Sequence, residues 1–249
     1  MARYQIILAY DGTHFVGSQR QADSRTAQGE LENALRKLGW QGQTVLLAGR
    51  TDTGTHASGQ VAAFDLDWGH GLVKLQDALN AHLPHDMAVR EVKLTEDTFH
   101  PRFDATSRRY RYRLFCDCTR DPLRERYAWR VWPTVANLMP LAAIWLGTHD
   151  FTSFGTPPRT GGTTVRTVFS AEWQSHGDEW TFEIQADAFL YRMVRRLVFV
   201  QVAVGQGRLK PEKLVRALEN RPKAHSQIPP SLAPASGLTL IEVRYDNLF

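Results

Sequence analysis

A glycine-rich stretch at residues 48–60, AGRTDTGTHASGQ, surrounds a single carboxylate, Asp52, with glycines and hydroxyl residues. Glycine permits positive φ angles and close approach of a ligand, so such a loop can lay Asp52 against a substrate. An ionised carboxylate there can act as a nucleophile, as a base or as the electrostatic partner of a developing cation. A flexible polar loop in which Asp52 bonds its own backbone fits the same residues. Neither of the usual phosphate-loop spacings, GxxxxGKS/T or GxGxxG, occurs in the stretch.

Arginine and tyrosine alternate within residues 102–113, RFDATSRRYRYR. On a strand, Tyr110 and Tyr112 share one face, and the arginines between and beside them share the other. This interleaving suits single-stranded or looped RNA, because bases stack on rings while guanidinium groups hold phosphates. A strand whose tyrosines face a core and whose arginines face water is the alternative interpretation.

A third basic group lies in residues 186–196, ADAFLYRMVRR. On a helix, Arg192, Arg195 and Arg196 stand at i, i+3 and i+4 and point to a common side. The residues around them are largely apolar, so we expect at least one of these arginines to be partly buried and to need an acidic partner. A solvated basic face is the alternative.

The composition is that of an ordinary globular protein. The 249 residues include 30 Lys+Arg and 26 Asp+Glu, for a formal charge of +4, and 43% are hydrophobic. This small charge confines any nucleic-acid site to a local patch. The apolar runs are too short for a membrane helix or a signal peptide, and the histidines lack metal-ligand spacing. Cys116 and Cys118 are too close in sequence for a disulfide between them to link distant parts of the fold. We therefore expect a cytoplasmic protein with free thiols.

The order of elements that must position these residues follows from apolar periodicity. In each half of the chain, the order of the predicted strands and helices matches the split β-α-β pattern. We therefore expect an α+β fold of two tandem ferredoxin-like units. Their sheets would lie side by side with a substrate groove between them, in domains at residues 1–104 and 105–249. The predicted strands are 4–10, 45–48, 61–66, 87–94, 107–115, 165–174, 179–188 and 238–245, and the predicted helices are 27–38, 72–83, 135–146, 190–204 and a short one near Leu214.

Seven segments, in order along nearly the whole chain, resemble the tRNA pseudouridine synthase A family. The most specific is AGRTDTGTHASGQ, which is similar to that family's AGRTDxGVHA loop and places Asp52 at the nucleophile position. Ser18 stands where the family usually has Trp, and Thr55 stands where it usually has Val. The other matching segments are YDGTHFVGSQRQ, LNAHLPHDMAVR, FHPRFDATSRRYRYRL, GTHDFTSF, ADAFLYRMVRR and APASGLTL.

The resemblance implies roles for five residues. Asp52 would be the catalytic nucleophile, and Arg50 beside it would position or contact the RNA. Tyr110 would lie against the target base, Arg195 would pair with Asp52, and Leu238 would help to line the pocket. The resemblance also implies a homodimeric isomerase without metal or cofactor. Its substrate would be tRNA, in which it would convert uridine to pseudouridine at positions 38, 39 and 40 of the anticodon arm.

Two other functions remain open at this point. A noncatalytic RNA-binding module would keep the arginines and tyrosines but would not need Asp52. A nucleoside or glycoside hydrolase would need a second carboxylate near the first, and Asp52 is the only carboxylate in residues 48–60.

Overall fold

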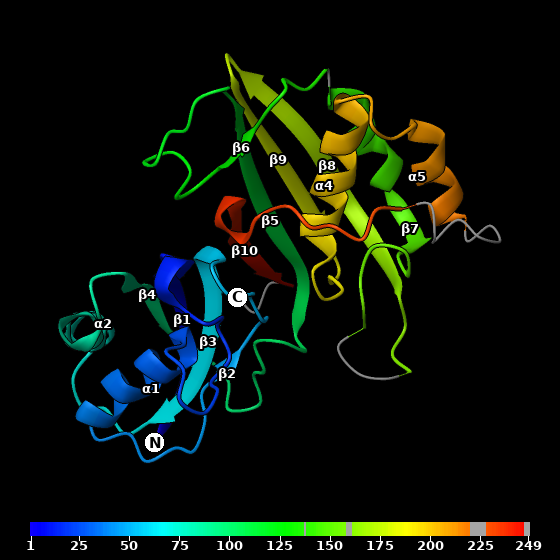
Figure 1. Cartoon of the computed structure of the whole chain (residues 1–249). Helices are drawn as coiled ribbons and strands as arrows, with labels where there is room; N and C mark the ends of the chain where they lie inside the picture. The colour runs from blue at the N-terminus through cyan, green and yellow to red at the C-terminus, as the bar shows by residue number, and fades with distance from the viewer. Residues whose placement is uncertain (137, 158–160, 220–227, 247–249) are drawn as a thin grey trace. The chain divides into compact units, whose positions relative to one another are not determined.

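The computed structural model describes residues 1–136, 138–157, 161–219 and 228–246 (Figure 1). The chain is a mixed α/β protein with mostly antiparallel strand pairing. It divides into two compact units, of which the second comprises Ser107–Leu238 and the first comprises Met1–Thr106 together with the segment from Thr239 onward. In the part of the chain that the structure describes, no helix is long and apolar enough to cross a membrane.

The sheet of the first unit is built around β1 (Ala2–Tyr10). This strand is antiparallel to both of its neighbours, β3 (His56–Leu66) and β4 (Met87–Leu94). The short strand β2 (Leu46–Leu47) pairs with β3 in antiparallel orientation, and β10 (Leu238–Tyr245) pairs with β3 in parallel. The loop that carries Asp52 therefore connects two paired strands, β2 and β3.

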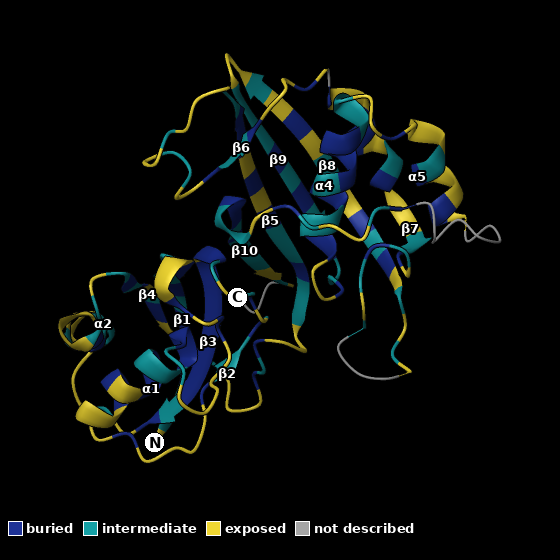
Figure 2. Cartoon of the chain, in the orientation of Figure 1, coloured by how far each residue is buried: buried dark blue, intermediate teal, exposed yellow. Residues whose placement is uncertain are grey.

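The core of the first unit confirms the predicted periodicity. Along β1 the alternating residues of the predicted strand are buried, and β3 is buried along nearly its whole length (Figure 2). Helix α1 (Ala27–Lys37) begins where Thr26 predicts, because the Thr26 side chain accepts a hydrogen bond from the Gly29 N–H at 3.2 Å. Helix α2 (Leu72–His82) packs beside α1 and against β4 (Figure 1).

The sheet of the second unit begins at β5 (Ala105–Cys116) and continues through β9 (Glu179–Ala186) and β8 (Val165–His176) to β7 (Gly147–Asp150). These neighbours are antiparallel, and β6 (Trp129–Val131) adds to β5 in parallel. The predicted hairpin between β8 and β9 is confirmed. Strands β6 and β7 were not predicted, because each is shorter than a periodic pattern can reveal.

Two helices follow the hairpin, α4 (Met193–Gly205) and α5 (Pro211–Leu218). Helix α4 lies over the sheet of the second unit (Figure 1). A buried hydrogen bond of 2.8 Å from Trp173 Nε1 on β8 to Gln201 Oε1 on α4 joins the two layers. Cys116 and Cys118 are free thiols, as predicted.

The helix predicted over residues 135–146 is wrong for most of its length. Its described residues form only α3 (Met139–Ala142) and a following 3-10 turn, Ala143–Trp145, while residue 137 lies outside the described part of the chain. Pro140 stands in the first turn of α3. Proline has no N–H to donate and clashes with a preceding helical turn, so a helix can begin at it but cannot run through it.

Candidate active site

The Asp52 loop contains a defined turn. The Thr55 N–H donates to the Asp52 carbonyl at 3.0 Å, and Gly54 has a φ of 77°. Only glycine adopts that angle without strain, so Gly54 is required for the turn. Asp52 is half-buried and Arg50 is exposed. The turn therefore presents both side chains from one short segment.

Neighbouring segments brace this loop through its backbone. The Gly54 N–H donates to the Phe15 carbonyl at 3.3 Å, and the Ala48 N–H donates to the Val61 carbonyl at 2.9 Å. His56, at the start of β3, accepts the Gly12 N–H at its Nδ1 at 3.0 Å and is buried. This hydrogen bond joins the start of β3 to the segment that follows β1.

Strand β5 carries the predicted alternation. Tyr110 and Tyr112 are buried, whereas Arg111 is exposed. Arg109 and Arg111 both form ion pairs with Glu183 on the adjacent strand β9, with Arg111 Nη2 lying 2.6 Å from Glu183 Oε1. These two guanidinium groups are therefore held against a carboxylate within the sheet.

The two tyrosines of β5 have different surroundings. Tyr110 exposes 9% of its surface. Its ring contacts the Phe189 ring edge to face, with 5.1 Å between the two ring centroids. The Tyr112 hydroxyl donates to the Pro234 carbonyl at 2.8 Å. Burial raises the pKa of Tyr112 well above its usual value, and the charge of Arg195 lowers it by less. Tyr112 is thus a neutral structural phenol.

Arg195 stands in the first turn of α4 and binds the segment that leads into β10. Its Nε donates to the Ala233 carbonyl at 2.8 Å, and its own carbonyl accepts the Ala233 N–H at 3.2 Å. Leu238, the first residue of β10, is buried at the end of that segment. Arg195 and Tyr112 therefore both hold the residues that precede Leu238.

The expected common helical face of three arginines is wrong for Arg192. That residue precedes α4 in a left-handed conformation, with φ of 63°, so only Arg195 and Arg196 lie on the helix. The helix cannot begin earlier because Tyr191 forms a β-bridge with Thr156. Arg196 Nη1 donates to the Pro229 carbonyl at 3.4 Å, and burial lowers the pKa of Arg196.

The five predicted site residues are divided between the two units. Arg50 and Asp52 lie together in the first unit. Tyr110, Arg195 and Leu238 lie in the second. The pairing of Arg195 with Asp52 stays a prediction, since it joins residues of different units.

A group of buried polar residues that contact the Asp52 loop was not predicted from the sequence. Ser18 and Thr51 are both buried and are hydrogen-bonded to each other. The only local signal was the departure of Ser18 from the family's usual Trp. Its contact with Thr51 spans more than thirty positions, which a pattern of neighbouring residues does not reveal.

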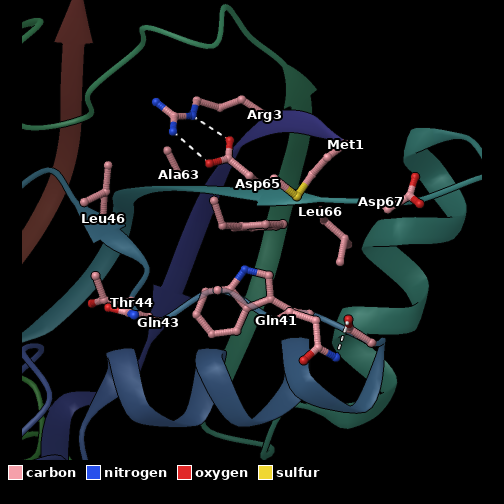
Figure 3. Close-up of a pocket in the computed structure, with 14 residues that line it drawn as sticks. Met1, Arg3, Gln41, Gln43, Thr44, Leu46, Ala63, Asp65, Leu66 and Asp67 are labelled. Carbon is pink, nitrogen blue, oxygen red and sulfur yellow. Dashed lines mark hydrogen bonds and ion pairs between the residues drawn. The ribbon is translucent and has the colours of Figure 1, made fainter.

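A cavity of about 470 Å³ opens elsewhere in the first unit, between β3 and the segment that follows α1 (Figure 3). Its charged lining includes Arg3 and Asp65, which are paired with each other at 2.8 Å. None of the five predicted site residues lines it. Among the described residues, no group of three or more His, Cys, Asp or Glu side chains could hold a metal ion.

Comparison with known proteins places these features in a family. The family model described as tRNA pseudouridine synthase matches residues 6–104 and 141–246. A tRNA pseudouridine synthase A of Chloroflexus aurantiacus is 40% identical over 98% of this chain and 89% of its own length. A tRNA pseudouridine synthase A 1 of Bacillus cereus is 38% identical over 99% of this chain and 100% of its own.

Among solved structures, the crystal structure of a Cbf5-Nop10-Gar1 complex matches 81% of this chain and 45% of its own, with 12% identity and a TM-score of 0.35, which is too low to bear on the fold. Both the family model and the two relatives span the Asp52 loop and the C-terminal strand. The chain therefore belongs to the tRNA pseudouridine synthase family.

Proposed function

We propose that this chain converts uridine to pseudouridine in tRNA, at positions 38, 39 and 40 of the anticodon arm. The observation that carries the proposal is a half-buried Asp52 on a braced turn, in a chain of the tRNA pseudouridine synthase family. The names of the relatives support tRNA as the substrate.

The reaction is an isomerisation that keeps every atom of the nucleoside. The bond between N1 and C1′ breaks, the bound base turns, and a bond forms between C5 and C1′. The C5 proton leaves and N1 gains a proton, so no oxidant, reductant or cofactor is needed for balance. The target uridine must first leave its stack, at a cost of a few kcal/mol.

In this proposal the Asp52 carboxylate is the nucleophile: it attacks C1′ as the bond between C1′ and N1 breaks, and C5 of the turned base then displaces the carboxylate from C1′. Removal of a proton at C2′ and electrostatic stabilisation of an oxocarbenium-like state are the other roles open to the same group. Arg195 pairs with Asp52, because a nearby guanidinium favours the ionised form of a carboxylate. Arg50 contacts the RNA, and Leu238 lines the pocket.

Tyr110 stacks on the target base and assists removal of the C5 proton. An aromatic ring suits both tasks, because its face accepts a base while its hydroxyl exchanges a proton. The buried ring and its edge contact with Phe189 support a fixed orientation.

We also propose that the two domains predicted at residues 1–104 and 105–249 are split β-α-β units with a substrate groove between their sheets, although the closing segment from Thr239 onward belongs to the first compact unit. The element order β1-α1-β2-β3-α2-β4 in the first unit supports this architecture. We expect the protein to work as a homodimer in the cytoplasm, where its tRNA substrate is found.

The test uses the purified protein and an unmodified tRNA transcript with uridine at all three positions, together with three transcripts that each keep one of them. Pseudouridine is mapped by chemical modification and primer extension. We expect product at each of the three positions. Tight tRNA binding without product would support the noncatalytic RNA-binding module instead, and release of free uracil would support a hydrolase.

A further inference from the structure

Four buried polar side chains gather beneath the backbone that carries Arg50 and Asp52. Each exposes 6% or less of its surface, although each bears a hydrogen-bonding group. Polar groups at such depth are costly unless they are paired. We call these four residues the Ser18 cluster: Tyr10, Ser18, Thr51 and Gln60.

Ser18 and Thr51 bond to each other in both directions. The Ser18 N–H donates to the Thr51 carbonyl at 3.1 Å, and the Thr51 N–H donates to Ser18 Oγ at 2.8 Å. The second bond depends on a side chain. Removing the Ser18 hydroxyl would leave the Thr51 N–H buried without its acceptor, which carries the full desolvation cost of that donor.

Tyr10 and Gln60 secure the same segment. The Tyr10 hydroxyl lies 2.8 Å from Thr51 Oγ1, and Gln60 Nε2 donates to the Gly49 carbonyl at 2.9 Å. Burial raises the pKa of Tyr10 by more than its hydrogen bond with Thr51 lowers it, so this phenol stays neutral. The cluster therefore holds the backbone on both sides of Arg50, directly before Asp52, without adding a charge.

We propose that Ser18 is a positioning residue for the isomerisation, because its hydroxyl fixes the Thr51 backbone and thereby the direction of the Asp52 carboxylate. The inference rests on the proposed role of Asp52. Displacing a reacting group by about 1 Å can cost about 10²-fold in rate. The effect of losing the Ser18 hydroxyl should therefore fall on the chemical step and not on tRNA binding.

The test compares Ser18→Ala, Ser18→Cys and the matched control Thr55→Val. The Thr55 hydroxyl, in the same loop, is also buried but has no hydrogen-bond partner among the described residues, so its loss should leave the chemistry intact. We expect kcat to fall about 10- to 100-fold in Ser18→Ala. It should fall less in Ser18→Cys, whose thiol is a weak acceptor, and remain at the wild-type value in Thr55→Val. The Kd for tRNA should stay within about twofold throughout.

Folding is checked by circular dichroism, and if Ser18→Ala does not fold, Ser18→Cys carries the comparison with Thr55→Val. A Ser18 variant with normal kcat and a lowered Tm would overturn the inference, because its role would be structural only. An equal loss of kcat in Thr55→Val would overturn it as well. Asp52→Asn is assayed in parallel. Activity in Asp52→Asn refutes the proposed function itself, whereas an inactive Asp52→Asn beside a fully active Ser18→Ala refutes only the role of Ser18.

Discussion

Single residues near Asp52 differ in whether their buried hydroxyls have partners. Thr55 exposes 2% of its surface, and its Oγ1 has no hydrogen-bond partner within the described residues. Thr55→Val replaces that hydroxyl with a methyl group of similar size. We expect it to raise the free energy of unfolding by about 1 kcal/mol and Tm by about 2 to 4 °C.

Urea unfolding measures this change, and Thr51→Val is the matched comparison. That variant loses a hydroxyl bonded to Tyr10, so it should lower the free energy of unfolding. Equal destabilisation by the two variants would show that the partner of the hydroxyl does not decide the outcome.

At Tyr110, the contribution of the ring to tRNA binding can be separated from the contribution of the hydroxyl to turnover. Stacking on a base needs only the ring, whereas removal of the C5 proton needs the hydroxyl. Tyr110→Phe should therefore keep tRNA affinity within a few fold and slow turnover by about 10² to 10⁴, as expected for a lost general base. Binding and single-turnover assays measure the two quantities. Near-normal turnover would leave Tyr110 with stacking alone.

Among the elements, β3 and β10 approach each other closely at Gly59. A Cβ at that position would lie 2.2 Å from the Ile241 carbonyl oxygen. Gly59→Ala should push the strands apart and lower the free energy of unfolding by about 1 to 3 kcal/mol, the range for overpacking. Gly49→Ala is the control, because a Cβ there meets nothing within 4 Å. Thermal unfolding of both variants tests this, and equal Tm values would contradict the close approach.

The loop after β1 is tied to the turn before β4 by an ion pair. Arg25 Nη1 lies 2.7 Å from Asp86 Oδ2. The hydrogen bonds that the Arg25 guanidinium donates to the Asp86 carboxyl hold the pKa of that carboxyl below its usual value. The contribution to stability is therefore present above the unfolded pKa of about 4 and is lost as the pH falls through the folded value.

Asp86→Asn should lower the free energy of unfolding at pH 7 by about 1 kcal/mol, the upper end for a partly exposed pair. The difference between variant and wild type should shrink below a pH of about 4. Urea unfolding of both proteins from about pH 2.5 to 7 measures this difference in the free energy of unfolding. A difference that stays constant over that pH range would mean that the loss of the Asp86 charge does not cause the lower stability of the variant.

Local signals placed most element boundaries, because the residues that cause them are neighbours in sequence. Thr26 caps α1, and the predicted bounds of β4 and β10 match the structure. Where a tertiary contact decides the boundary, the prediction failed. Helix α4 begins three residues later than expected, because Tyr191 pairs with Thr156 across the fold.

The candidate site was predictable only in part for the same reason. The glycine-rich loop and Asp52 stand out in sequence, because both are local. The bond between Ser18 and Thr51, the Tyr10 hydroxyl beneath them and the pairing of Arg109 with Glu183 join residues far apart in the chain. Periodicity carries no information about such pairs.

In the whole molecule, the formal charge of +4 does not show which arginines are exposed and which are paired with carboxylates. Arg109 and Arg111 are already held by Glu183, so RNA phosphates would have to compete with that carboxylate for them. Exposed Arg50 lies beside Asp52. We therefore expect electrostatic attraction of tRNA to depend on such exposed cations more than on the arginines of β5.

We propose that Asp52 performs the chemistry of this tRNA pseudouridine synthase. The most direct measurement is pseudouridine mapping on an unmodified tRNA transcript with wild-type protein and Asp52→Asn, alongside the Kd of both proteins for that tRNA. The amide has nearly the same shape as the carboxylate but cannot act as the nucleophile. We predict no pseudouridine from Asp52→Asn with an unchanged Kd. Retained turnover in the pure variant would show that Asp52 is not the nucleophile.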